Sequence, residues 1–161
     1  MKVLLNGLVL VGALVIGTNQ APVLAQGQGA AFVALASGSQ AIVVAQVDSV
    51  KPLWLENERG DRIIVSRLLL RVEETLKGEA AGLQWMDLPG GTIDGLTLHV
   101  SSVPTLSLCD RAVFFLEHRG SQALWSPRQN GQGILLLDEN DTVRGTSLRL
   151  DDVRAVAGNG N

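Results

Sequence analysis

Apolar and polar residues between positions 41 and 137 follow the two-residue repeat of β-strands, and the 3.6-residue repeat of a helix is almost absent. The run 41–47 is apolar apart from Gln46 and rich in β-branched residues, as in a strand buried within a sheet. In the run 62–72, the even positions from Ile64 to Val72 are apolar apart from one serine, and two arginines lie on odd positions. We therefore expect two strands here, the second with its even positions facing the core. Two apolar residues share the arginine face, which a long, curved strand in a small barrel would explain.

Further runs of apolar or alternating residues predict more strands, at 83–88, 92–100, 112–116, 123–126 and 133–137. Charged or Gly-rich stretches predict the turns between strands, at 56–61, 89–91 and 138–141. The most hydrophobic run, 112–116, is expected at the centre of a sheet, and 92–100 shows the clearest alternation. Residues 151–156 predict a short terminal helix.

About seven short strands with so little helical periodicity predict an all-β fold, and no repeat of fixed period is present. A closed or nearly closed antiparallel barrel and a β-sandwich both satisfy this pattern. We favour the small antiparallel barrel, followed by a short C-terminal helix.

The first 25 residues have the order of a secretory signal peptide. Lys2 supplies a positive charge, an apolar run continues to Gly17, and small residues end at Ala25, after which cleavage is expected. The apolar run is shorter than the roughly 20 residues that a helix needs to cross a bilayer. A lipid anchor would need a cysteine beside the cleavage site, and the only cysteine is Cys109. We therefore expect a secreted or periplasmic protein with no membrane segment after cleavage.

Composition divides the chain into four parts. A Gly-, Ala- and Gln-rich stretch after the cleavage site is expected to be flexible, as is the Gly- and Asn-rich end. The remainder suits one domain with a single modest core. The expected parts are a signal peptide at 1–25, a flexible leader at 26–39, a single β-barrel domain at 40–154 and a flexible tail at 155–161.

Charge and cysteine content narrow the classes of protein. Without Lys2, the chain carries 12 basic and 16 acidic residues, a net charge of −4 with His neutral, and no basic cluster. Nucleic-acid binding needs Lys and Arg on one face, so we expect no nucleic-acid partner. A single cysteine cannot form an internal disulfide. Cys109 is expected to be buried or to pair between chains, and burial is favoured because free cysteine behaves as a small hydrophobe.

No arrangement of residues points to catalysis. His99 and His118 fall in different segments and lack the H-x-x-H or H-x-H spacing of metal ligands. Cys109 with either histidine could form a nucleophile and base, but no Gly-rich elbow or oxyanion loop accompanies it. The acidic run 138–141 lacks the glycine and closing glutamate of an EF-hand, and no helix with Lys-Ser or Lys-Thr follows the glycines at 89–91. We therefore expect no catalytic residue, no cofactor and no metal.

The three tryptophans of the chain, Trp54, Trp85 and Trp125, offer a candidate binding surface. An apolar ring with a polar N–H can stack against a sugar or a peptide, and the alternative is that the rings fill the core. Trp54 and Trp125 lie near expected loops, so they are the candidate ligand-surface residues.

Three stretches, taken in order, resemble a group of uncharacterised exported bacterial proteins: 41–47, 70–78 and 103–116. Some members of that group carry such a module ahead of a secreted metalloprotease domain. More distantly, the stretches resemble the netrin-like, tissue-inhibitor-of-metalloproteinases domain. Both share an opening V-V-x-x-V strand, a strand ending in V-x-x-x-(L/F)-K-G, a glycine-bearing loop and a hydrophobic strand. The resemblance covers roughly residues 40–120 and implies an OB-type barrel of five strands.

Two features depart from these families. The inhibitor family places a cysteine at its mature N-terminus to meet the protease metal, and this chain has none there. That mode of inhibition is therefore not implied. Cys109 stands where the bacterial group has glycine before an acidic residue.

Three functions remain open. The first is an exported, non-catalytic module that binds a protein or peptide partner, with a secreted metalloprotease among the candidates, through barrel loops or an exposed strand edge. The second is a carbohydrate or small-ligand binder, which needs Trp54 and Trp125 exposed and close together. The third is a cysteine-dependent enzyme, which needs Cys109 within reach of a histidine.

Overall fold

The computed structural model describes residues 26–57, 59–118 and 124–158. The expected signal peptide therefore lies outside the described residues. The elements, in chain order, are α1 (Gln26–Gly38), β1 (Ala41–Glu56), β2 (Arg62–Lys77), β3 (Leu83–Pro89), β4 (Gly91–Ile93), β5 (Leu96–Leu98), β6 (Arg111–His118), β7 (Trp125–Pro127), the 3-10 helix η1 (Asn130–Gly133), β8 (Ile134–Leu136) and α2 (Leu150–Gly158).

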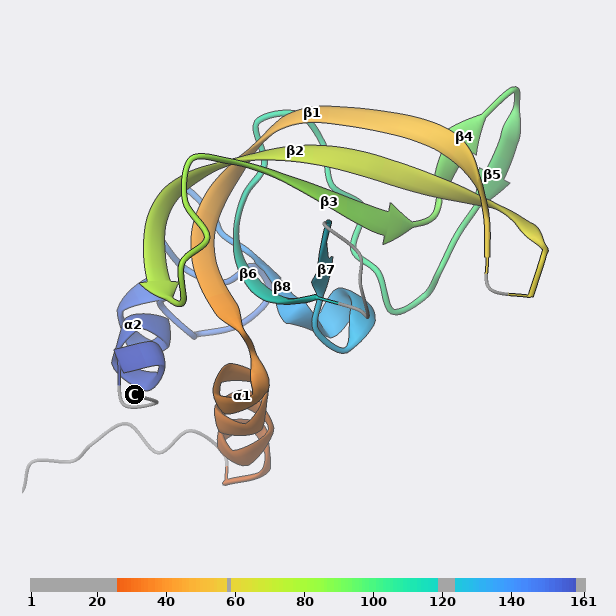
Figure 1. Cartoon of the computed structure of the whole chain (residues 1–161). Helices are drawn as coiled ribbons and strands as arrows, with labels where there is room; N and C mark the ends of the chain where they lie inside the picture. The colour runs from red at the N-terminus through yellow and green to blue at the C-terminus, as the bar shows by residue number, and fades with distance from the viewer. Residues whose placement is uncertain (1–25, 58, 119–123, 159–161) are drawn as a thin grey trace, which may run out of the picture.

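Five of the strands form a ring (Figure 1). The order is β1-β2-β3-β7-β6, and β6 pairs back with β1. All contacts in the ring are antiparallel except the one between β3 and β7, where Met86 lies opposite Trp125 in parallel register. β8 pairs with the same side of β6 as β7 does. The predicted all-β, barrel-like fold is confirmed, with a mixed rather than purely antiparallel sheet.

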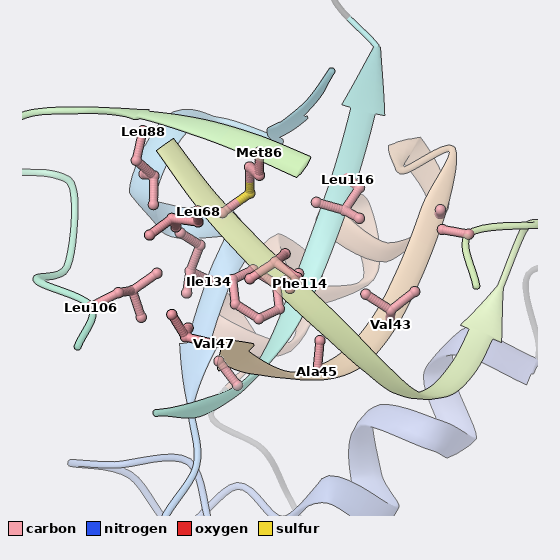
Figure 2. Packing of buried hydrophobic residues seen from close by; sticks show 14 residues of the cluster. Val43, Ala45, Val47, Leu68, Met86, Leu88, Leu106, Phe114, Leu116 and Ile134 are labelled. Carbon is pink, nitrogen blue, oxygen red and sulfur yellow. The ribbon is translucent and has the colours of Figure 1, made fainter. Parts of the chain in front are cut away.

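Buried apolar residues form two clusters, one on each face of β1 and β6. The first fills the ring and includes Val43, Leu68 and Phe114 (Figure 2). The second lies on the other face of β1 and β6, beneath the helices, and includes Val44 and Phe115. Successive residues of a strand point to opposite faces, so a strand that is buried on both faces must be apolar throughout. This explains the continuous apolar runs of 41–45 and 112–116.

The hairpin of β1 and β2 extends beyond the ring (Figure 1). β1 pairs with β2 as far as Glu56 but with β6 only from Ala41 to Gln46. At the tip, Asn57 Oδ1 accepts the backbone N–H groups of Arg59 and Asp61, both at 2.9 Å. The turn predicted at 56–61 is present in the residues that the structure describes, which exclude residue 58, and the long, curved second strand is present as β2.

The even-numbered face of β2 is the core face, as predicted. Leu68 and Leu70 are fully buried in the ring and Val72 packs against them. The strands expected at 83–88, 112–116, 123–126 and 133–137 correspond to β3, β6, β7 and β8; Ala123 lies outside the described residues.

The single strand expected at 92–100 is instead the short β4–β5 hairpin. Asp94 and Gly95 form its turn, with φ of 52° and 76°. An Asp-Gly pair is a two-residue hairpin signal, and here it interrupts an otherwise regular alternation. Leu96 is 58 % exposed in consequence.

The N-terminal stretch differs from the flexible leader expected at 26–39, because it forms α1. Leu35 and Ala36 are buried against the outer face of β1 and β6, and the Phe32 ring meets that of Phe115 edge-on at 5.9 Å. Lys77 Nζ donates to the carbonyl oxygens at the helix end. Burial and capping stabilise a helix that its Gly-rich composition does not favour.

The C-terminal helix predicted at 151–156 is present as α2. It continues through part of the tail expected to be flexible at 155–161, because Ala157 is buried against the second cluster. Residues 159–161 lie outside the described part of the chain.

Candidate functional site

An exposed tryptophan lies on the outer face of β2 and β3. The even positions of β3, such as Met86, point into the ring, so its odd positions point outward. Trp85 is 44 % exposed and Leu83, two residues earlier on the same face, is 60 % exposed. Leu69 of β2 lies directly opposite Trp85. These three side chains form an apolar surface on the outside of the barrel.

An ion pair borders this surface on one side. Arg67 lies opposite Asp87 and donates two hydrogen bonds to it, from Nε to Oδ1 and from Nη2 to Oδ2, both at 2.7 Å. The hydrogen bonds to Asp87 raise the pKa of Arg67 above its ordinary value, so the guanidinium stays charged. A bidentate pair of this kind has a fixed geometry.

A second arginine borders the surface on the other side. Arg71 donates from Nε to Asp48 Oδ1 at 3.1 Å and from Nη2 to Gln46 Oε1 at 2.6 Å. The register of β1 and β2 shifts between Val47 and Ser49, so Asp48 is the extra residue of a bulge. The bulge lets Asp48 reach across to β2.

The arrangement combines an exposed ring, two leucines and two arginines held by acidic or amide partners on a sheet surface. Aromatic residues and arginine are enriched in protein interfaces, and Trp and Arg are the residue types most often found as binding hot spots. We call this surface the Trp85 face, and its members are Arg67, Leu69, Arg71, Leu83, Trp85 and Asp87.

The two tryptophans selected from the sequence do not form a shared platform. Trp54 is half-buried on the hairpin extension, with the Arg62 guanidinium 4.8 Å above its ring. Trp125 is half-buried on β7, packs against the ring cluster and stacks on His118 with 3.8 Å between ring centroids. Its Nε1 donates to Gln84 Oε1 at 3.0 Å. Since β1 and β7 are not neighbours in the ring and Trp54 lies beyond the part of β1 that β6 covers, the two rings do not meet.

Trp85 is the functional candidate that the sequence argument missed. The only indication in the sequence was the alternation along the strand. Trp85 shares one face with Asp87, whereas Met86 and Leu88 share the other. Six residues with apolar side chains on both faces do not by themselves show which face is outside.

A cavity of about 270 Å³ lies above the ring cluster. Leu68 and Leu106 belong to its apolar floor, and Thr92, Thr97 and His99 belong to its rim. The two threonine hydroxyls hydrogen-bond to each other at 2.9 Å. No Asp, Glu, Lys or Arg of the described residues lines the cavity, so it suits a neutral group.

Cys109 is exposed, which corrects the expectation that it is buried. Its φ of 68° places it in a turn, where the Ser107 N–H donates to Asp110 Oδ2 at 2.8 Å. Cys109 and His118 flank opposite ends of β6, and eight residues at about 3.3 Å each separate these ends by more than 20 Å. These two residues therefore cannot act as a nucleophile and its base.

The remaining polar candidates are engaged in local structure. Asp138 Oδ1 accepts the backbone N–H groups of Asn140 and Thr142, both at 2.9 Å, and Asp141 pairs with Arg111. Within the described ranges, no group of three or more His, Cys, Asp or Glu side chains is arranged to hold a metal ion. Nor does any helix in those ranges have the length and apolar character needed to cross a membrane.

Comparison of the chain with family models, with curated proteins and with solved structures gave no significant match in any of the three.

Proposed function

We propose that this chain is an exported, non-catalytic module that binds a protein partner through the Trp85 face. The observation that carries the proposal is Trp85 itself, a large aromatic side chain left 44 % exposed between two arginines on a rigid sheet. Burying such a ring against a partner removes a large apolar area from water. The arginines are already positioned by their partners, so little side-chain freedom is lost on binding.

The order of strands in the ring supports the OB-type assignment that the resemblance implies. In OB barrels the face of the second and third strands binds oligonucleotides and oligosaccharides, and the Trp85 face lies on the matching strands, β2 and β3. The negative charge of the chain and the absence of a basic cluster in its sequence favour a protein over a nucleic acid as the ligand. A secreted metalloprotease stays a candidate partner, from the resemblance alone.

The test is capture of a partner from culture supernatant or periplasmic extract by the immobilised chain from Gln26 onward. Trp85→Ala should weaken capture by about 30-fold or more, the loss expected of a hot-spot residue. Leu96→Ala is the matched control, because Leu96 is also an exposed apolar residue but lies on β5. The proposal fails if both variants capture equally well, or if both lose the partner.

A carbohydrate is the principal competing ligand for the same face, because a tryptophan ring can also stack on a sugar. The test is retention of the chain on immobilised polysaccharide. If Trp85→Ala loses retention and Leu96→Ala keeps it, the ligand of this face is a glycan and not a protein.

The cavity above the ring cluster supports a second candidate function, the binding of a small neutral molecule. A lining without Asp, Glu, Lys or Arg and a hydroxyl-bearing rim favour a ligand with an apolar body and a hydroxyl group. Calorimetric titration with neutral monosaccharides and short alcohols tests this function. Thr97→Phe should abolish any binding by filling the rim, and no heat from any compound would count against it.

A further inference from the structure

One edge of β1 is open along its outer half. β6 covers this edge only from Ala41 to Gln46. At Val47 the segment before β6 still pairs with it, since the Val47 N–H donates to Asp110 O and the Cys109 N–H donates to Val47 O, both at 2.9 Å. Beyond that point, no described residue hydrogen-bonds to the edge that faces away from β2. β4 packs against β1 at Pro52 without pairing with it, since a Cβ added to Gly91 would lie 3.7 Å from the Pro52 Cβ.

The register shows which backbone groups lie on the open edge. Ile64 O accepts the Gly90 N–H at 2.9 Å, so the backbone groups of Ile64 point away from β1. Trp54 lies opposite Ile64, and in an antiparallel ladder its own N–H and C=O therefore also point away, toward the open edge. By the two-residue repeat, Val50 and Pro52 present their groups to the same edge. The available groups are the N–H and C=O of Val50 and Trp54 and the C=O of Pro52.

The side chains beside the edge define the chemistry of an added strand. Lys51 is exposed and forms no ion pair with any residue that the structure describes. Leu53 follows it on the same face and is half-buried, while Val50, on the opposite face, is 37 % exposed. A strand laid along this edge would place one side chain next to Lys51 and others against the apolar neighbours.

Pro52 and Lys51 argue against a second copy of this chain as the added strand. Pairing two β1 edges brings in two prolines, each without an N–H, and two lysines of like charge. Lysine and proline on an edge strand both disfavour pairing with another chain, and pairing two copies of this edge would count each of them twice. A different strand with an acidic residue avoids the like charges and adds no second proline. It can donate an N–H to Pro52 O, and only its carbonyl opposite the Pro52 nitrogen is left without a donor.

We propose that the open edge of β1, from Ser49 to Leu55, accepts an extended segment of a partner protein as an added β-strand, with an acidic residue beside Lys51 and apolar residues around it. This edge lies two strands away from Trp85 and can be tested without it. One partner has room to contact both the edge and the Trp85 face, but binding at either surface does not depend on binding at the other.

The probe is the capped peptide Thr-Leu-Val-Glu-Val-Leu-Thr, which reads the same in both directions and so suits either strand orientation. Its binding should slow hydrogen exchange of the Val50 and Trp54 amides, measured by NMR. The version with a central lysine should bind about fivefold more weakly, and Lys51→Glu should reverse this preference. Trp85→Ala should leave peptide binding unchanged, so failure here is separate from failure of the Trp85 face.

Val50→Pro removes an outward N–H without removing a hydrogen bond to β2, and it should abolish peptide binding. Val50→Thr is its matched control, because it keeps the N–H and the β-branched shape. If Val50→Pro does not fold, the charge reversal at Lys51 still decides the question. Three results would each overturn the proposal. The first is equal binding of the glutamate and lysine peptides by the native chain and by Lys51→Glu, and the second is unchanged hydrogen exchange of the Val50 and Trp54 amides. The third is a dimer of the chain that Val50→Pro dissociates.

Discussion

Cys109 occupies a backbone conformation that glycine adopts more readily than cysteine does. Its φ is 68° and its side chain is exposed, so the residue contributes neither packing nor a disulfide within the chain. The turn, rather than reactivity, accounts for the geometry at this position.

Substitutions at Cys109 should therefore follow backbone preference. Cys109→Gly should leave the free energy of unfolding unchanged or raise it by up to about 1 kcal/mol, because relief of strain exceeds the added freedom of the unfolded chain. Cys109→Val should lower it by about 1–2 kcal/mol, because a β-branched residue tolerates positive φ poorly. Urea unfolding measures both values. Equal stability of the valine variant would contradict the left-handed turn.

Gly78 closes the Leu-Lys-Gly motif, and the neighbouring backbone leaves no room for a side chain there. Its φ is 75°, and a Cβ there would lie 2.4 Å from the backbone oxygen of Gln40. Gly78→Ala should lower the free energy of unfolding by about 2 kcal/mol or more, since both backbone strain and the clash must be relieved.

Gly82 provides the matched control for this steric argument. Its φ is 68°, but a Cβ added there would have no neighbouring atom within 4 Å. Gly82→Ala should cost only the backbone term, about 1 kcal/mol. Thermal and urea unfolding of the two variants separate the contributions, and equal losses would show that the contact with Gln40 has no effect.

At the scale of elements, strands with one or both faces buried were predictable from the sequence, whereas the largely exposed stretch at 92–100 was wrongly predicted to be one strand. β2 shows its core face by alternation, and β6 shows burial on both faces by an unbroken apolar run. α1 was not predictable because its stability depends on tertiary contacts of Phe32 and Leu35. Helical propensity is low in a stretch with several glycines, and packing overrides it.

The contact between Lys77 and the end of α1 should hold the helix against the barrel. Lys77 Nζ donates to the carbonyl oxygens of Ala36 and Ser37, both at 3.0 Å. Lys77→Met should lower the free energy of unfolding by about 1 kcal/mol and speed amide exchange in α1 but not in β6. Lys51→Met is the control, because Lys51 lies on the open edge. Unchanged exchange in α1 would show that the helix does not need this cap.

At the scale of the whole molecule, charged pairs join elements far apart in the sequence. Arg154 of α2 donates to Glu74 of β2, with Nη2 2.6 Å from Oε2, and hydrogen bonds to Glu74 and then to Asp151 raise its pKa. Arg111 of β6 pairs with Glu73 of β2 at 2.6 Å. Such pairs could not be predicted from the sequence, because they depend on the ring bringing β2, β6 and α2 together. Both pairs lie at the surface and are at most part-buried, so they set geometry more than stability.

Adjacent residues of β6 connect the two apolar clusters. Phe114 is fully buried inside the ring, and Phe115 is fully buried beneath the helices. Because one strand supplies both, loss of either cluster removes support from the other. The domain should therefore unfold as one cooperative unit.

Phe114→Ala and Phe115→Ala test this cooperativity as a matched pair. Each should lower the free energy of unfolding by about 3–5 kcal/mol, the usual cost of truncating a buried phenylalanine. In both variants, tryptophan fluorescence, which reports on the barrel, and far-UV circular dichroism, which includes the helices, should change at the same urea concentration. If Phe115→Ala loses the helical signal first while the fluorescence transition stays in place, the helices form a separate unit. β1 shares this arrangement, because its Ile42 and Val44 lie beneath the helices while Val43 lies in the ring. A separate helical unit would require both β1 and β6 to keep one face packed after losing the other. Coincident transitions are therefore the expected result.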